Sequence, residues 1–183
     1  MKNSLIIIFC LLLFNNCKKK EIDALPPATQ NGANTFGCLI NGNAWVSTGK
    51  PSSLSGSGMK PIEGGYQYRY NDSLRNNVLL WATRGDGTTV QLYINRVFKP
   101  GTYQLLFNSG TYPSSVVPYS YGFFSDNTSL YLTSTYHKGT VIITKADTLN
   151  DAVAGTFQFE GYDNVTKKTI SVTNGRFDFL YKP

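Results

Sequence analysis

Histidine, cysteine and charged residues are all scarce in this sequence. Its 183 residues include 1 His and 3 Cys, and only 15% of them are charged. Because His137 is the single histidine, a multi-histidine metal site is impossible. No G-x-S-x-G elbow, HExxH helix or Walker loop is present. The sequence therefore indicates no cofactor and no metal, and it names no reaction.

The length and the aromatic content fit one folded domain. A single core in a chain of 183 residues can remove roughly 70% of the unfolded surface from water. The 12 Tyr, 11 Phe and 2 Trp, together with the low charge, exclude a disordered chain, a coiled coil and collagen. Beyond residue 34 the lysines and arginines are scattered, apart from Lys167-Lys168, and form no basic stripe. We therefore expect no nucleic-acid partner.

The first sixteen residues are typical of an export signal. Lys2 precedes an unbroken apolar run of ten residues, from Leu5 to Phe14. A helix of ten residues spans about 15 Å, half of a hydrocarbon core of roughly 30 Å, so we expect no membrane-spanning helix. We predict a signal peptide over residues 1–16 and an extracytoplasmic location for the rest of the chain.

A cysteine follows the apolar run after two asparagines. Cys17 stands before Lys18-Lys19-Lys20, and this arrangement resembles the lipobox of bacterial lipoproteins. The resemblance implies that Cys17 carries acyl chains such as palmitate and anchors the protein to the outer membrane, on its periplasmic or surface face. Residues 17–34 include Pro26-Pro27 and small polar residues without periodicity, which predicts a flexible tether behind the lipidated cysteine. The expected membrane contact is therefore made through a lipid.

The remainder, residues 35–183, is predicted to be a single all-β domain. Its apolar residues alternate with a period of two, while Asn41-Gly42 and Gly85-Asp86-Gly87 favour hairpin turns. About ten short strands should form an antiparallel β-sandwich, with an up-and-down, lipocalin-like barrel as the alternative. Cys38 alternates with apolar neighbours and is expected in the core, and residues 49–65 are expected to form a loop. Beyond the first hairpin, strands are predicted at 78–83, 89–95, 102–107, 119–124, 130–133, 140–145, 156–162, 169–172 and 176–181.

Turn glycines and core aromatics recur near both ends of this domain. They include Phe36-Gly37-Cys38 with Asn41-Gly42, then Gly155-Thr156-Phe157 and Asn174-Gly175-Arg176-Phe177. In these segments the chain resembles a functionally uncharacterised family of small secreted lipoproteins of Gram-negative bacteria, known as a domain of unknown function. The resemblance implies a β-domain of the cell envelope and supplies no catalytic residue. Residues from about 49 to 138 lie outside it.

Tyrosines are the candidate ligand-binding residues. A tyrosine offers a flat apolar face with a hydrogen-bonding tip, which suits sugars and peptides, although cross-strand packing is the alternative role. Tyr112, Tyr119, Tyr121 and Tyr136 lie among Ser, Asn, Thr and Pro residues. We therefore expect a binding or structural module of unknown specificity, with a glycan or a peptide as the possible ligand.

Two rival functions remain open from the sequence. A lipocalin-like carrier would hold a small apolar ligand inside its barrel. A glycan-acting hydrolase would need two carboxylates at a suitable separation. Glu160 and Asp178 alternate with phenylalanines and are expected to face solvent, and His137 is expected in a surface loop. The candidate carboxylates are Asp147, Asp151, Glu160, Asp163 and Asp178.

Overall fold

The computed structural model describes residues 21–50, 58–67, 76–107 and 119–181. In this part the chain is built almost entirely from antiparallel strands, which confirms the predicted all-β class. No helix of the described part is both long and apolar enough to cross a membrane. One sheet contains β1 (Thr35–Ile40), β2 (Asn43–Val46), β3 (Ile62–Tyr66), β4 (Val78–Thr83), β5 (Thr89–Ile94), β6 (Gly101–Leu105), β7 (Tyr121–Ser125), β8 (Leu130–Leu132), β9 (Gly139–Asp147), β10 (Ala152–Tyr162) and β11 (Thr169–Leu180).

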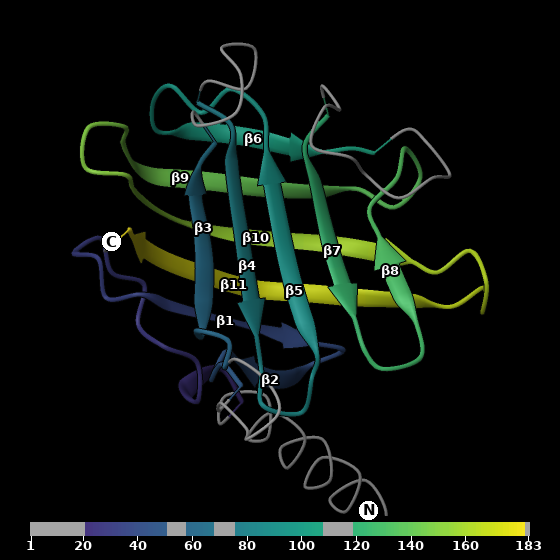
Figure 1. Cartoon of the computed structure of the whole chain (residues 1–183). Helices are drawn as coiled ribbons and strands as arrows, with labels where there is room; N and C mark the ends of the chain where they lie inside the picture. The colour runs from purple at the N-terminus through teal and green to yellow at the C-terminus, as the bar shows by residue number, and fades with distance from the viewer. Residues whose placement is uncertain (1–20, 51–57, 68–75, 108–118, 182–183) are drawn as a thin grey trace, which may run out of the picture.

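The sheet folds over on itself into two layers (Figure 1). A front layer of β3, β4, β5, β7 and β8 crosses a back layer of β6, β9, β10, β11, β1 and β2. The long strand β10 joins the layers, because it pairs with β9 along residues 152–159 and with β8 through Tyr162 opposite Leu132. On the other side, β3 pairs with β4 alone among the described strands. The fold is therefore a half-barrel, joined at one corner and open at the opposite side.

The core lies between the two layers. The front layer contributes alternate side chains of β4 and β5, such as Leu80 and Leu92, and both are fully buried. The back layer contributes an aromatic cluster, in which the ring of Phe36 lies 5.0 Å from that of Phe157 and 6.1 Å from that of Trp45. The inner faces of both layers thus contribute buried apolar side chains to one core.

The first hairpin forms where the sequence predicts it. Asn41 and Gly42 have φ angles of 50° and 86° and connect β1 to β2. A two-residue turn of type I′ needs positive φ at both positions, and Asn and Gly tolerate it best. On the returning strand Trp45 pairs with Cys38, whose thiol is buried, and this burial raises the pKa of the thiol. The prediction that Cys38 is a core residue is confirmed.

The predicted loop at residues 49–65 is partly wrong, because it contains β3. Gly64 in this strand has a φ of 127°, and a Cβ at this position would collide with the carbonyl oxygen of Leu79 on β4. Glycine therefore allows the close approach of the two backbones. The glycines that favour a loop in the sequence are here part of a paired strand.

The two strands predicted at 169–172 and 176–181 form the single strand β11. Asn174 lies between them with a φ of 51°, where the pairing of β11 with β10 shifts by one residue. This shift is a β-bulge, which bends a strand without ending it. The Asn-Gly pair at 174–175 therefore marks a bulge and not a turn.

Phe36 provides a test of the aromatic core. Replacing Phe36 by Ala should lower the free energy of unfolding by about 3–5 kcal/mol, because the ring is fully buried against Trp45, Phe157 and Phe177. Urea unfolding followed by circular dichroism measures the change. The control Leu149→Ala lies in the β9–β10 turn at a side chain that is 94% exposed, and it should cost less than about 0.5 kcal/mol. Equal losses in the two variants would contradict this description of the core.

Candidate functional site

Residues 21–34, which we name the strap, lie along the outer face of the back layer. At its start the carboxylate of Glu21 accepts a hydrogen bond of 2.7 Å from the backbone N–H of Ala44 on β2. Further along, the guanidinium of Arg176 on β11 donates to the carbonyl oxygen of Pro26 at 3.2 Å. The sequence predicts residues 17–34 to be a flexible tether, whereas several residues of the described part of that segment are hydrogen-bonded to the β-domain.

The centre of the strap contact is the carboxylate of Asp178 on β11. It accepts a hydrogen bond of 2.7 Å from the hydroxyl of Thr29. It also accepts hydrogen bonds from the backbone N–H groups of three successive residues, at 3.0 Å from Asn31, 2.9 Å from Gly32 and 3.1 Å from Ala33. The strap thus folds around one negative charge, which it covers almost completely, since Asp178 is only 1% exposed.

The prediction that Asp178 faces solvent is wrong. Its side chain does point to the outer face of the sheet, but the strap covers that face. Burial alone would raise the pKa of Asp178, and the hydrogen bonds from Thr29 and from the N–H groups of Ala33 and Gly32 outweigh it, so the pKa is lowered. Glu160 on β10 lies outside the strap contact and is exposed, as predicted.

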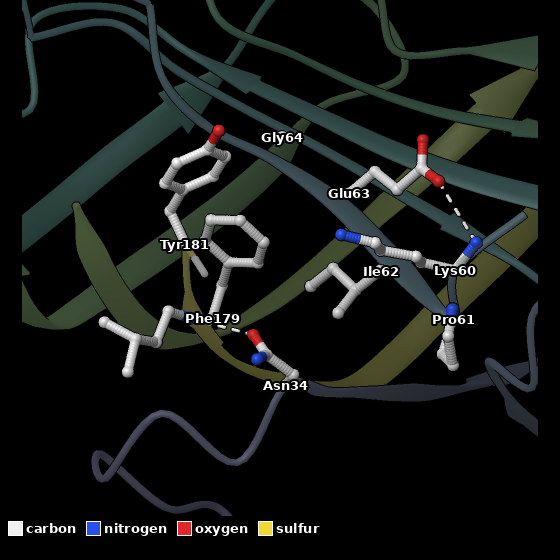
Figure 2. A pocket seen from close by; sticks show the side chains of 9 residues that line it. Asn34, Lys60, Pro61, Ile62, Glu63, Gly64, Phe179 and Tyr181 are labelled. Atoms are coloured by element: carbon white, nitrogen blue, oxygen red, sulfur yellow. Dashed lines mark hydrogen bonds between the residues drawn. The ribbon is translucent and has the colours of Figure 1, made fainter. Parts of the chain in front are cut away.

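The strap ends beside a cleft of about 380 Å³, which we name the lateral cleft (Figure 2). Asn34 lines it from the strap, residues 60–64 line it from β3 and the segment before it, and residues 179–181 line it from the end of β11. This is the side on which the half-barrel does not close. The lateral cleft therefore lies along the unpaired side of the half-barrel, between β3 of the front layer and the end of β11 in the back layer, and we call this side the seam.

Asp151, in the turn between β9 and β10, fastens the two walls of this seam together. Its carboxylate accepts a hydrogen bond of 2.8 Å from the N–H of Tyr66 at the end of β3. Its carbonyl oxygen accepts one of 3.0 Å from the N–H of Tyr181 after β11. The strap is joined to the wall formed by the end of β11, because the side-chain oxygen of Asn34 accepts a hydrogen bond of 2.9 Å from the N–H of Leu180. These contacts join the two walls of the lateral cleft to each other.

The lateral cleft combines an apolar floor with charged groups at its rim. Ile62 and Phe179 are each 4% exposed and supply the floor. Figure 2 shows the ring of Tyr181 beside that of Phe179, with the side chains of Lys60 and Glu63 across from them. The carboxylate of Glu63 accepts the backbone N–H of Lys60 at 3.0 Å. Aromatic faces beside a cation and a carboxylate suit a ligand that carries both apolar and polar groups.

Of the tyrosines predicted from the sequence, the three that the structure describes lie outside the lining of this cleft. Tyr121 is buried, with its ring stacked 5.3 Å from that of Tyr93 and its hydroxyl accepting a hydrogen bond from Gln91. Tyr119 and Tyr136 are 44% and 90% exposed. Tyr112 and the predicted lipidation site Cys17 fall outside the described residues. A ligand site at the exposed tyrosines therefore stays a prediction. The residues of the lateral cleft were missed because half of them lie in a segment predicted to be a loop.

The five candidate carboxylates are engaged in separate places. Asp147 and Asp163 accept N–H groups within their own turns, Asp151 lies at the lateral cleft, Asp178 lies beneath the strap and Glu160 lies beside His137. Within the described ranges, no three His, Cys, Asp or Glu side chains gather as a possible metal site.

His137 is less exposed than a surface loop predicts. Its ring stacks on that of Tyr162 at 4.9 Å, and its side chain is 25% exposed. The Nδ1 atom lies 3.6 Å from a carboxylate oxygen of Glu160. The histidine therefore packs against β10 and lies outside the lining of the lateral cleft.

Comparison with known families covers most of the β-domain. A family model described as a domain of unknown function (DUF6252) matches residues 66–179. The chain belongs to this family. The DUF6252 match runs from the end of β3 to β11, so it includes strands of both layers and leaves out the strap and the β1–β2 hairpin. It confirms the predicted membership of an uncharacterised family, and it covers the middle segment that the sequence resemblance left out. Neither a curated protein nor a solved structure matches the chain.

The strap gives this DUF6252 protein an acid-sensitive contact. Because the pKa of Asp178 is lowered by folding, its stabilising effect is complete above the unfolded value of about 3.9 and is lost as the pH falls through the folded value. Asp178→Asn should therefore lower the free energy of unfolding at pH 7 by about 1–3 kcal/mol and weaken the further loss in acid. Urea unfolding at a series of pH values measures both effects.

The exposed carboxylate of Glu160 provides the matched control for Asp178. Glu160→Gln on the neighbouring strand should change the stability at pH 7 by less than about 0.5 kcal/mol. If Asp178→Asn has no larger effect than Glu160→Gln, the Asp178 carboxylate does not hold the strap.

Proposed function

We propose that this protein is exported, acylated at Cys17 and anchored to the outer membrane, where its β-domain acts as a binding module of the cell envelope. The apolar leader at residues 5–14 and the cysteine that follows it support export and acylation. The strap supports the anchored arrangement, because it begins four residues after Cys17 and binds the domain along its length. The family match concerns the β-domain and leaves the location to experiment.

The binding role rests on the lateral cleft. Its volume of about 380 Å³ lies within the range of ligand pockets, roughly 300–1,000 Å³. Its walls are fixed by Asp151, so a ligand would enter a preformed site and less of its binding energy would be spent on ordering the protein. The ligand class that fits is a peptide or a glycan, with a flat apolar group against Tyr181 and polar groups at Lys60 and Glu63.

Removal of the acylation site tests the anchor. In cells that express the full chain, Cys17→Ala should move the protein from the membrane fraction to the soluble fraction of the envelope. The wild type should carry the added mass of acyl chains, and the variant should not, as measured by intact-mass spectrometry. The control Cys38→Ser changes a buried cysteine of the core and should leave the protein on the membrane. A Cys17→Ala protein that stays on the membrane would refute the anchor.

Substitutions in the lateral cleft test the binding site. The purified mature protein is applied to a glycan array and to a peptide array, and the strongest probe is titrated. Lys60→Ala and Tyr181→Ala should each weaken binding about tenfold, because each removes a group at the rim or wall of the cleft.

Two controls locate the site. Lys138→Ala removes an exposed lysine away from the lateral cleft and should leave the affinity unchanged. Tyr119→Ala and Tyr136→Ala test the site predicted from the sequence. Loss of binding in the tyrosine variants, with full binding in the cleft variants, would move the site to the exposed tyrosines and refute the cleft.

A further inference from the structure

The strap limits how far the domain can stand from its lipid anchor. Glu21 is held on β2 through the N–H of Ala44. Glu21 follows Cys17 by four residue steps, and four extended residues span at most about 14 Å. If the strap were free up to Asn34, seventeen residues could span about 61 Å. Docking of the strap therefore reduces the maximum span between Cys17 and the domain from about 61 Å to about 14 Å. It also fixes the point of attachment at the β2 edge of the back layer.

The back layer has a near edge and a far edge with respect to this point. Its strand order is β2-β1-β11-β10-β9-β6, which places five inter-strand steps between β2 and β6. At about 4.8 Å a step, β6 lies about 24 Å across the sheet from β2. Figure 1 shows these two strands at opposite margins of the molecule.

We propose that the protein stands on the membrane with the β1–β2 hairpin and the β2 edge toward the lipid headgroups and the β6 edge away from them. The proposal rests on the acylation of Cys17 proposed above. The partner surface is a bilayer with anionic headgroups, because Lys18, Lys19 and Lys20 lie between the acylated residue and the strap.

The short attachment at the β2 edge favours this orientation over one in which the back layer lies flat on the membrane. The outer face of the back layer, with the strap on it, carries both signs of charge, with exposed carboxylates on Asp23 and Glu160 and the cationic groups of Lys145 and Arg176. The β1–β2 turn at 41–43 consists of exposed Asn and Gly residues without charge. The turn of the near edge therefore adds no negative charge of its own beside the three lysines.

Spin labels at the two edges test the orientation. Asn43→Cys on β2 and Thr102→Cys on β6 place a nitroxide at exposed positions, and Cys38 is buried and stays unlabelled. The mature acylated protein is reconstituted into vesicles of phosphatidylcholine and phosphatidylglycerol that contain a nickel-chelating lipid. The headgroup nickel should accelerate the relaxation of the label at position 43 severalfold more than at position 102. Equal effects, or a larger effect at 102, overturn the proposal.

Release of the strap is the matched variant. In the double variant Glu21→Ala, Asp178→Asn the difference between positions 43 and 102 should shrink, because the strap loses its contacts with β2 and β11 and the free segment behind Cys17 becomes longer. Circular dichroism checks that the variant is folded, and the double variant Glu21→Ala, Thr29→Val replaces it if it is not, since it removes two strap contacts and keeps Asp178. An unchanged difference in a folded variant overturns the role of the strap.

Failure of the anchor gives a different signature. Without acylation the wild-type protein does not float with the vesicles and shows no added mass, and this result overturns both the anchor and the orientation. A protein that is acylated and floats, but shows equal relaxation at the two edges, overturns the orientation alone.

Discussion

The arrangement of this protein depends on one buried carboxylate and the peptide groups that surround it. Asp178 would be costly to bury alone, and the hydroxyl and N–H groups of the strap compensate its charge. This contact joins residues near the start of the chain to its last strand. It covers the outer face of β11 and brings Asn34 to the wall of the lateral cleft, so the N-terminal segment belongs to the folded domain and to its candidate site.

The lateral cleft follows from a sheet that curves without closing. The front and back layers share β10 at one corner, and the opposite side is held by Asp151 through single hydrogen bonds to β3 and to the residue after β11. A closed barrel would fill this seam with a ladder of backbone hydrogen bonds and leave no space there. The open seam instead exposes an aromatic wall and a charged rim beside a rigid, well-packed core.

Local patterns predicted most strands, and tertiary contacts decided the rest. Alternation and the Asn-Gly turn located β1, β2, β4 and β5, because those signals act over a few residues. The glycines of β3 and the Asn174 bulge were misread, since a positive φ fits a loop and a distorted strand equally well. The burial of Asp178 and the cleft residues could not be predicted, because the strap and β11 meet across about 145 residues of sequence.

Leu180 lies at the boundary between the strap contact and the lateral cleft. Its N–H binds Asn34, its side chain packs against Gly32 of the strap, and the same residue lines the lateral cleft. The docked strap and one wall of the lateral cleft therefore share a residue and form one continuous contact. A ligand that bound the cleft as proposed and stabilised Leu180 would, by linkage, bind more tightly when the strap is docked.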